Sequence, residues 1–129
     1  MQAEVQQALS LYGWPVARVM LAAVFLYSGQ DKLRHWQAGV AEVSNMGLPL
    51  PSVFAAATIV TQLLGGLSLA VDFWAPAGAV LLAFFTVAAT VLGHPFWRLQ
   101  GNAAQQALTT SLEHVAIVGG LLLVVVHAL

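Results

Sequence analysis

Residues 52–93 read SVFAAATIVTQLLGGLSLAVDFWAPAGAVLLAFFTVAATVLG, and Asp72 is the one charged residue in this stretch. The residues on either side of Asp72 form two apolar runs, and each comes close to the roughly 20 residues that an α-helix needs to cross a bilayer. Asp72, Phe73 and Trp74 leave room only for a tight turn between the two runs. Helices joined so closely pack as antiparallel neighbours, so the stretch predicts a membrane-spanning helical hairpin.

Two further apolar segments extend this interpretation to the whole chain. Membrane spans are expected at about 12–33, 52–71, 75–93 and 109–129. The composition agrees, because 60% of the residues are hydrophobic, 7% are charged and the mean hydropathy is +0.84, whereas soluble proteins have about 25% charged residues. We therefore predict an all-α, polytopic membrane protein. Residues 1–129 form a single domain, an antiparallel four-transmembrane-helix bundle with short interfacial segments.

The charges and the cysteine count exclude several classes of function. The formal net charge is −1 and the chain holds only four Lys and Arg residues, so there is no basic surface for a phosphate backbone and nucleic acid is excluded as a partner. The chain has no cysteine, which excludes disulfides, thiolate metal ligands and thiol relays carried by the chain itself. Any redox role must therefore use a borrowed cofactor or a bound substrate.

Two short segments are expected to lie at the membrane surface. Trp36, Val40 and Val43 repeat at helical spacing, with a polar side that includes Glu42, between the first and second spans. The aromatic and basic residues 94–98 follow the third span. Both segments can cover the same end of the bundle.

The positive charges predict the orientation of the bundle. The N-terminal tail, the turn at Asp72 and the C-terminus contain no Lys or Arg, whereas the other two connections contain Lys32, Arg34 and Arg98. Positive residues favour the cytoplasmic side. We expect a multi-pass protein of the bacterial inner membrane, with both termini on the non-cytoplasmic side.

Polar residues at membrane depth are the candidates for function, because each is costly unless it is paired or lines a cavity. Arg18, Ala22, Phe25, Gly29 and Lys32 share one stripe of the first span, with a cation at each end and small residues between them. The stripe predicts a face turned towards the bundle interior.

Further hydrogen-bonding groups gather near Lys32. Tyr27 and Gln30 precede it, and Glu113 and His114 open the last span at the same end of the bundle. Gln62 lies close to the bilayer midplane in the second span.

Each of these groups also has a structural interpretation. Arg18 and Asp72 reach the same leaflet and are expected to form an ion pair, and Gln62 with Thr58 is expected to join two helices. These are our structural polar residues. The paired glycines that begin at Gly65 are interpreted as packing positions.

Lys32 leaves two alternatives open, a salt bridge to Glu113 or contact with a ligand. Glu113, His94 and His114 could gather there, together with His35, but their spacing matches no metal motif and we predict no metal site. His127 is expected to be a solvated terminal residue.

The run RVMLAAVFLYSGQDKL, residues 18–33, resembles the first-helix signature of the DoxX family of small four-helix membrane proteins. The likeness continues through NMGLPLPSVFAAATIVTQLLGGLSLAV (45–71), the aromatic stretch 94–97 and HVAIVGGLLLV (114–124). Two positions depart from the pattern. Many members carry Glu where this chain has Gln62, and a Lys-Asn pair often stands where it has Glu113 and His114.

The resemblance implies a function at the level of a class. Some members resemble or serve as membrane subunits of thiosulfate:quinone oxidoreductases, and others accompany defence against quinones or oxidants. We therefore expect a quinone-linked or redox-associated membrane subunit that binds an apolar, ring-containing ligand within the bundle. The alternative is a non-catalytic membrane scaffold that tethers a partner, and a transporter is a weaker third interpretation.

An apolar slot with a few hydrogen-bond donors suits a quinone. The candidate ligand-binding residues are Lys32, His94, His114, Glu113, Tyr27, Gln30 and Gly29. No catalytic residue is assigned, whether the chain is an enzyme is left open, and no cofactor is expected to be covalently bound. The bilayer is the first partner, and a redox protein or a second copy of the chain are the others left open.

Overall fold

The computed structural model describes all 129 residues and contains helices but no strands. The helices are α1 (Gln2–Ala8), α2 (Trp14–Arg34), α3 (Trp36–Asn45), α4 (Pro51–Val71), α5 (Ala75–Gly93) and α6 (Gly101–Ala128). A π-helical segment, η1 (Leu9–Gly13), joins α1 to α2, and a 3₁₀ turn, η2 (Phe96–Arg98), follows α5. Four helical segments are long and apolar enough to cross a membrane: Gln2–Arg34, Pro51–Val71, Ala75–Arg98 and Gly101–Ala128. The predicted all-α membrane bundle is confirmed.

Two of these helices begin earlier than the predicted spans. The first helix starts at Gln2 rather than near residue 12, and α6 starts at Gly101 rather than near residue 109. The added segments are rich in Ala and Gln, which sustain a helix without membrane burial. Pro15 does not break the first helix. Its ring would clash with the Leu11 carbonyl group in a regular α-helix, and the π-helical turn over Leu9–Gly13 lies at that point.

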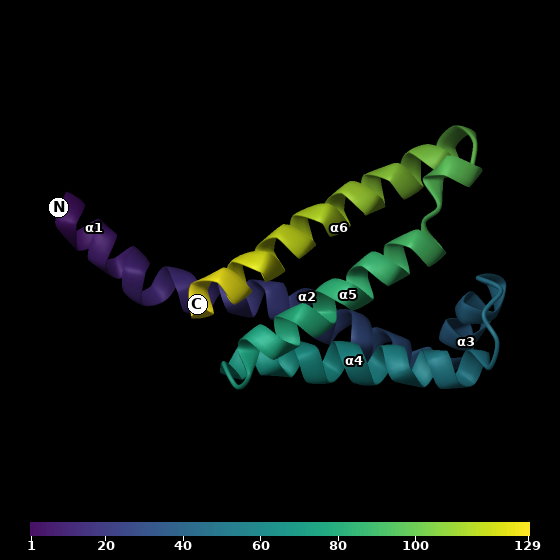
Figure 1. Ribbon diagram of the computed structural model, residues 1–129, viewed down its shortest axis with the longest axis horizontal. Helices are drawn as coiled ribbons and strands as arrows, with labels where there is room; N and C mark the ends of the chain where they lie inside the picture. The colour runs from purple at the N-terminus through teal and green to yellow at the C-terminus, as the bar shows by residue number, and fades with distance from the viewer.

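The bundle is a wedge of two helix pairs (Figure 1). Contacts are extensive between α2 and α4, between α4 and α5, and between α5 and α6, whereas α2 and α6 touch over only a short length. Both termini and the α4–α5 turn lie at one end, here called the terminal end, and α3 and η2 lie at the other, here called the α3 end. The pair α5–α6 diverges from α2 and α4 towards the α3 end (Figure 1).

The hydrophobic core explains why the wedge closes at the terminal end. A cluster of fully buried side chains joins all four long helices there, formed by Ala22, Phe25, Leu69, Ala75, Ala79, Leu82, Leu121 and Val124. The closest helix approach uses glycine, because a Cβ atom at Gly65 would lie 2.7 Å from Leu82 Cγ and one at Gly78 would lie 2.7 Å from Ser68 Oγ. Small residues at these positions bring α4 and α5 together.

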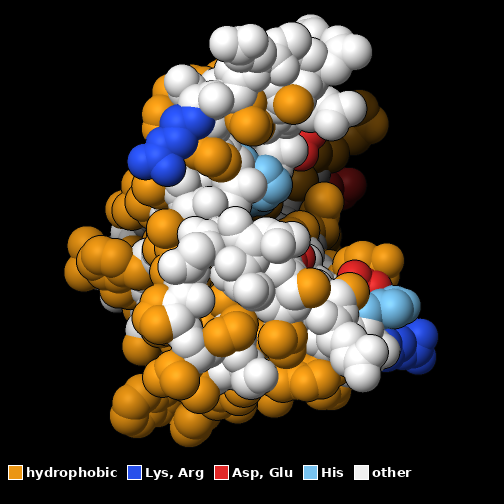
Figure 2. Space-filling view, turned by 90° about the vertical axis from the view of Figure 1, so that its right-hand side faces the viewer, with side chains coloured by type: hydrophobic (Ala, Val, Ile, Leu, Met, Phe, Trp, Pro, Cys, Tyr) orange, Lys and Arg blue, Asp and Glu red, His pale blue; other side chains and the backbone are white.

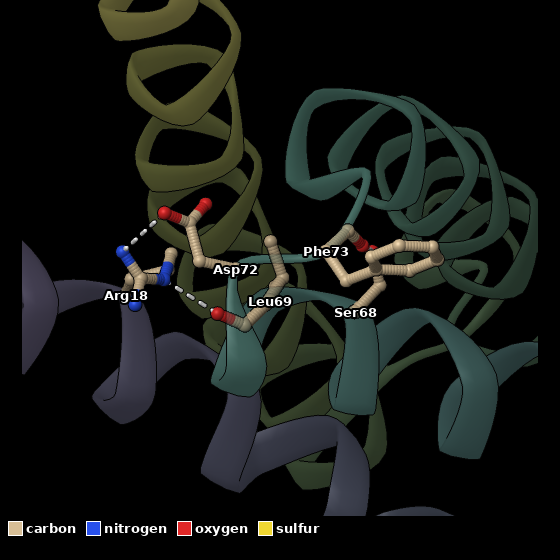
Figure 3. A network of polar contacts seen from close by, with 5 residues as sticks. All are labelled: Arg18, Ser68, Leu69, Asp72 and Phe73. Atoms are coloured by element: carbon tan, nitrogen blue, oxygen red, sulfur yellow. Dashed lines mark hydrogen bonds and ion pairs between the residues drawn. The ribbon is translucent and has the colours of Figure 1, made fainter.

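A polar network closes the terminal end (Figure 3). Arg18 Nε donates a hydrogen bond to the Leu69 carbonyl oxygen over 2.6 Å, and Arg18 Nη1 lies 3.6 Å from Asp72 Oδ2. Ser68 Oγ donates to the Phe73 carbonyl oxygen on the other side of the turn. Asp72 and Trp74 both adopt left-handed backbone angles, with φ of 57° and 56°, which reverses the chain in three residues. The network ties α2 to the end of α4.

Candidate functional site

A cavity of about 370 Å³ opens where the helix pairs diverge. Side chains from α2, α3, α4, α5 and α6 and from the residue after α5 line it, and most of them are apolar. The volume falls within the range of about 300–1,000 Å³ that small-molecule sites occupy. Its wall includes the large apolar side chains of Phe25, Trp36, Phe54, Ile59, Phe85, Leu92 and Ile117.

Several polar side chains line this cavity, and four of them come from four different parts of the fold. Lys32 comes from the last turn of α2, Gln62 from the middle of α4, His94 from the residue after α5, and His114 from α6. The helices bring together residues that lie up to 82 positions apart (114 − 32) in the chain. An apolar cavity with a small number of convergent polar groups is the usual form of a ligand site.

Gln62 lies at the inner end of the cavity without a protein partner. Its residue is 5% exposed, and its Oε1 atom is buried without any hydrogen bond. A Cβ atom built on Gly29 would lie 3.2 Å from Gln62 Cβ, which places the two residues at the same depth. Lys32 follows Gly29 by three residues, so it lies about 4.5 Å further along the helix axis towards the α3 end. The cavity therefore has an amide deep inside and a cation nearer its mouth.

Lys32 has no ion-pair partner in the structure, since the ion pairs are Arg18–Asp72 and Asp31–His35. The salt bridge to Glu113 that the sequence left open is therefore wrong. Glu113 is exposed and does not line the cavity. The helices α2 and α6 diverge at this end of the bundle (Figure 1).

The two histidines at the mouth form a pair. The rings of His94 and His114 meet edge to face with centroids 5.6 Å apart. Thr90 Oγ1 lies 2.7 Å from His114 Nδ1 and also donates to the Thr86 carbonyl oxygen over 2.6 Å. His114 is thus held in one orientation at the cavity wall.

The remaining candidates lie away from this cavity. Tyr27 is 70% exposed and Gln30 is half-buried, and neither lines it. Gly29 is buried against Leu63 and Gln62 of α4 and acts as a close-approach position.

Two other histidines lie in different surroundings. His35 does not join His94 and His114, because its Nδ1 lies 3.3 Å from Asp31 Oδ1. His127 is not simply solvated, as its exposed ring stacks on Trp14 with centroids 3.9 Å apart.

The contribution of α3 to the cavity wall was not predicted from the sequence. Gly39, Glu42 and Val43 of α3 and Met46, which directly follows it, all line the cavity, so α3 forms part of its wall as well as lying at the end of the bundle. The sequence pattern places Glu42 on the polar side of this helix, whereas in the structure Glu42 lines the cavity. The spacing i, i+3, i+4, i+7 of these four residues is the signal that could have identified this face.

The face at the α3 end carries most of the basic residues. Figure 2 views this end and shows Lys and Arg side chains at its two edges, histidine between them and hydrophobic side chains around them. Lys32, Arg34 and Arg98 all belong to segments at this end, while Arg18 lies at the other.

The fold and the site together define the class of this protein. It is a membrane-spanning helical bundle with a mostly apolar cavity that contains a few polar side chains. The DoxX family model matches residues 13–95, and the chain belongs to the DoxX family of integral membrane proteins. The chain is also similar to the inner membrane protein YphA of Escherichia coli (strain K12), with 25% identity over 111 residues that cover 86% of this chain and 79% of YphA. No solved structure matches the chain.

Proposed function

We propose that this protein is a redox-associated subunit of the bacterial inner membrane that binds a quinone in the cavity between its helices. The observation that carries the proposal is the unpartnered Gln62 amide at the inner end of a mostly apolar cavity, with Lys32, which has no ion-pair partner, nearer the mouth. The proposed location in the inner membrane agrees with the similar protein YphA, which is an inner membrane protein.

The distribution of polar groups favours a ring with polar oxygens at two edges. Leaving a buried polar group unpaired costs about 1–3 kcal/mol, so a ligand that hydrogen-bonds the Gln62 amide gains binding free energy. Gln62 Nε2 can donate to a quinone carbonyl oxygen, and Gln62 Oε1, the unpaired atom, can accept from a hydroquinone hydroxyl. Lys32 lies about one helical turn nearer the mouth, where it can donate to a second oxygen. The aromatic and aliphatic walls fit the faces of the ring between these two positions.

The chain's own residues bind the ligand and handle protons. A quinone supplies, when bound, the two-electron chemistry that the side chains of this chain lack. Lys32 holds an oxygen and stabilises negative charge on it, and a histidine at the mouth exchanges a proton with the aqueous side, which imidazole does near neutral pH. A partner protein or a diffusible reductant must deliver the electrons.

Binding of a short-chain ubiquinone or menaquinone analogue to protein in lipid nanodiscs tests the proposal. Lys32→Met, Gln62→Leu and His94→Ala should each weaken binding by about 1–3 kcal/mol, because each removes a hydrogen-bonding group from the cavity. Leu81→Ala is the matched control, since Leu81 is 49% exposed on α5 and lies outside the cavity. Absence of binding to the unmodified protein, with the Lys32 variant altered only in stability, would leave the non-catalytic scaffold as the function.

A further inference from the structure

The Thr90 hydroxyl fixes which nitrogen of His114 carries the proton. Thr90 Oγ1 lies 2.6 Å from the Thr86 carbonyl oxygen and 2.7 Å from His114 Nδ1. A carbonyl oxygen can only accept, and a threonine hydroxyl has one proton to donate. Because that proton is directed at Thr86, Thr90 Oγ1 must accept in its contact with His114. His114 Nδ1 is therefore the N–H donor.

This assignment leaves the other ring nitrogen of His114 as an acceptor. A neutral imidazole carries one N–H, so Nε2 has a free lone pair when Nδ1 is protonated. His114 lines the cavity, and Nε2 has no hydrogen-bond partner within the chain. Thr90 itself does not line the cavity, so it acts on a ligand only through His114.

We infer that Thr90 is a positioning residue that holds His114 ready to accept a hydrogen bond from a ligand hydroxyl, so that the cavity binds a hydroquinone more tightly than the corresponding quinone. A hydroquinone O–H donates to Nε2, whereas a quinone carbonyl oxygen brings a second lone pair towards it. Lys32 can donate to either form, and the Gln62 amide can donate from Nε2 to a quinone oxygen or accept at Oε1 from a hydroquinone hydroxyl, so neither group selects one form. The inference rests on the proposed function and adds the oxidation state that the site prefers.

The test compares the two oxidation states of one probe. A short-chain ubiquinone analogue and its hydroquinone are titrated anaerobically into protein in nanodiscs at about pH 8, where imidazole is neutral. The unmodified protein should bind the hydroquinone about tenfold more tightly, which corresponds to one net hydrogen bond. Thr90→Val should reduce this ratio to about twofold or less, since the ring can then present Nε2–H instead.

Two further variants separate positioning from general stability. Thr90→Ser keeps the hydroxyl and should keep the preference for the hydroquinone. Thr109→Val is the matched control, because Thr109 Oγ1 also donates to the carbonyl oxygen four residues earlier but is exposed and remote from the cavity. Its ratio should match that of the unmodified protein.

Nitrogen-15 NMR of histidine-labelled protein gives a readout of the tautomer without any ligand. The His114 signals, assigned by their loss in His114→Gln, should show protonated Nδ1 and unprotonated Nε2, and Thr90→Val should shift them towards a mixture.

The outcomes distinguish the two proposals. Equal affinity for both forms, or an Nε2–H tautomer in the unmodified protein, would overturn the inference while the quinone site stands. Failure to bind either form would overturn the proposed function and the inference together.

Discussion

Arg18 is the one charged residue among the buried residues of the bundle. Its guanidinium bonds the Leu69 carbonyl group, which lies in the last turn of α4 where carbonyl groups lack intrahelical partners. Asp72 is 62% exposed at its side chain, so its attraction to Arg18 is screened by solvent. The bond to the carbonyl group is therefore the larger contribution of Arg18.

Arg18→Leu should lower the free energy of unfolding in detergent by about 1–3 kcal/mol, because the helix end loses a charge-assisted hydrogen bond. Asp72→Asn should cost less than about 1 kcal/mol. The double variant should lose less than the sum of the two, since the ion pair is counted twice in that sum. Arg34→Leu, at an exposed and unpaired cation, serves as the control. Strictly additive losses in thermal unfolding would show that Arg18 and Asp72 do not interact.

The sequence identified cavity residues correctly where a polar or charged residue lies at membrane depth, since such a residue is costly unless it is paired or lines a cavity. Gln62 interrupts an apolar run and Lys32 ends the inward stripe of the first span, and both line the cavity. Tyr27 and Gln30 also carry hydrogen-bonding groups and lie close to Lys32 in the chain, but they lie on other sides of α2 and do not line the cavity. The sequence alone could not assign Glu42 to the cavity, because either side of a surface helix can face the bundle until the position of the helix is known.

At the scale of the elements, apolar composition located the four long helices, and local sequence markers located the ends of two of them. The ends of α4 and α5 lie within one residue of the predicted 52–71 and 75–93, because Pro51, the Asp72 turn and Pro76 mark them in the sequence. The first helix and α6 start before the predicted apolar spans begin, so the hydrophobic pattern does not locate these starts. Polar residues that form good helices extend both elements beyond the expected spans.

The glycine contacts between α4 and α5 support a direct test. Gly65→Ala should destabilise the protein by about 1–3 kcal/mol, because the new Cβ would lie 2.7 Å from Leu82 Cγ and would force the helices apart. Thermal unfolding in detergent measures the loss.

Gly119→Ala is the matched control in the middle of α6, where a Cβ meets nothing within 4 Å. This change should be neutral or stabilising by about 0.5–1 kcal/mol, as expected for replacing glycine inside a helix. Equal responses at the two positions would mean that close packing at Gly65 does not hold α4 against α5.

For the whole molecule, the two ends of the wedge differ in packing and in charge. The terminal end holds the buried core and the Arg18 network, whereas the α3 end holds the cavity, the histidine pair and the connections that carry Lys32, Arg34 and Arg98 (Figures 1 and 2). Helix order alone could predict that polar groups gather at one end. It could not predict the divergence of the helix pairs that makes room for a cavity, since divergence depends on where small side chains meet.

The charge asymmetry predicts the topology. A periplasm-active reporter fused after Leu129 should be active, because the positively charged connections favour the cytoplasm and both termini lie at the opposite end. A fusion after Arg98 gives the complementary control and should be inactive in the periplasmic assay. Activity of only a cytoplasm-active reporter at Leu129 would reverse the orientation.

The proposed function requires that the cavity bind a quinone in the native membrane, so the small molecules that copurify with the protein test it most directly. The protein should be purified gently from its own membranes and its extracted small molecules identified by mass spectrometry, in parallel with Ala89→Phe, which fills the cavity, and Ala56→Phe, which adds the same ring on the exposed side of α4. We predict a quinone that copurifies with the unmodified protein and with Ala56→Phe and falls by about tenfold or more in Ala89→Phe, as expected when more than about 1.4 kcal/mol of binding is lost. Purified protein without quinone, or equal quinone in both phenylalanine variants, would contradict the assignment of this cavity as a quinone site.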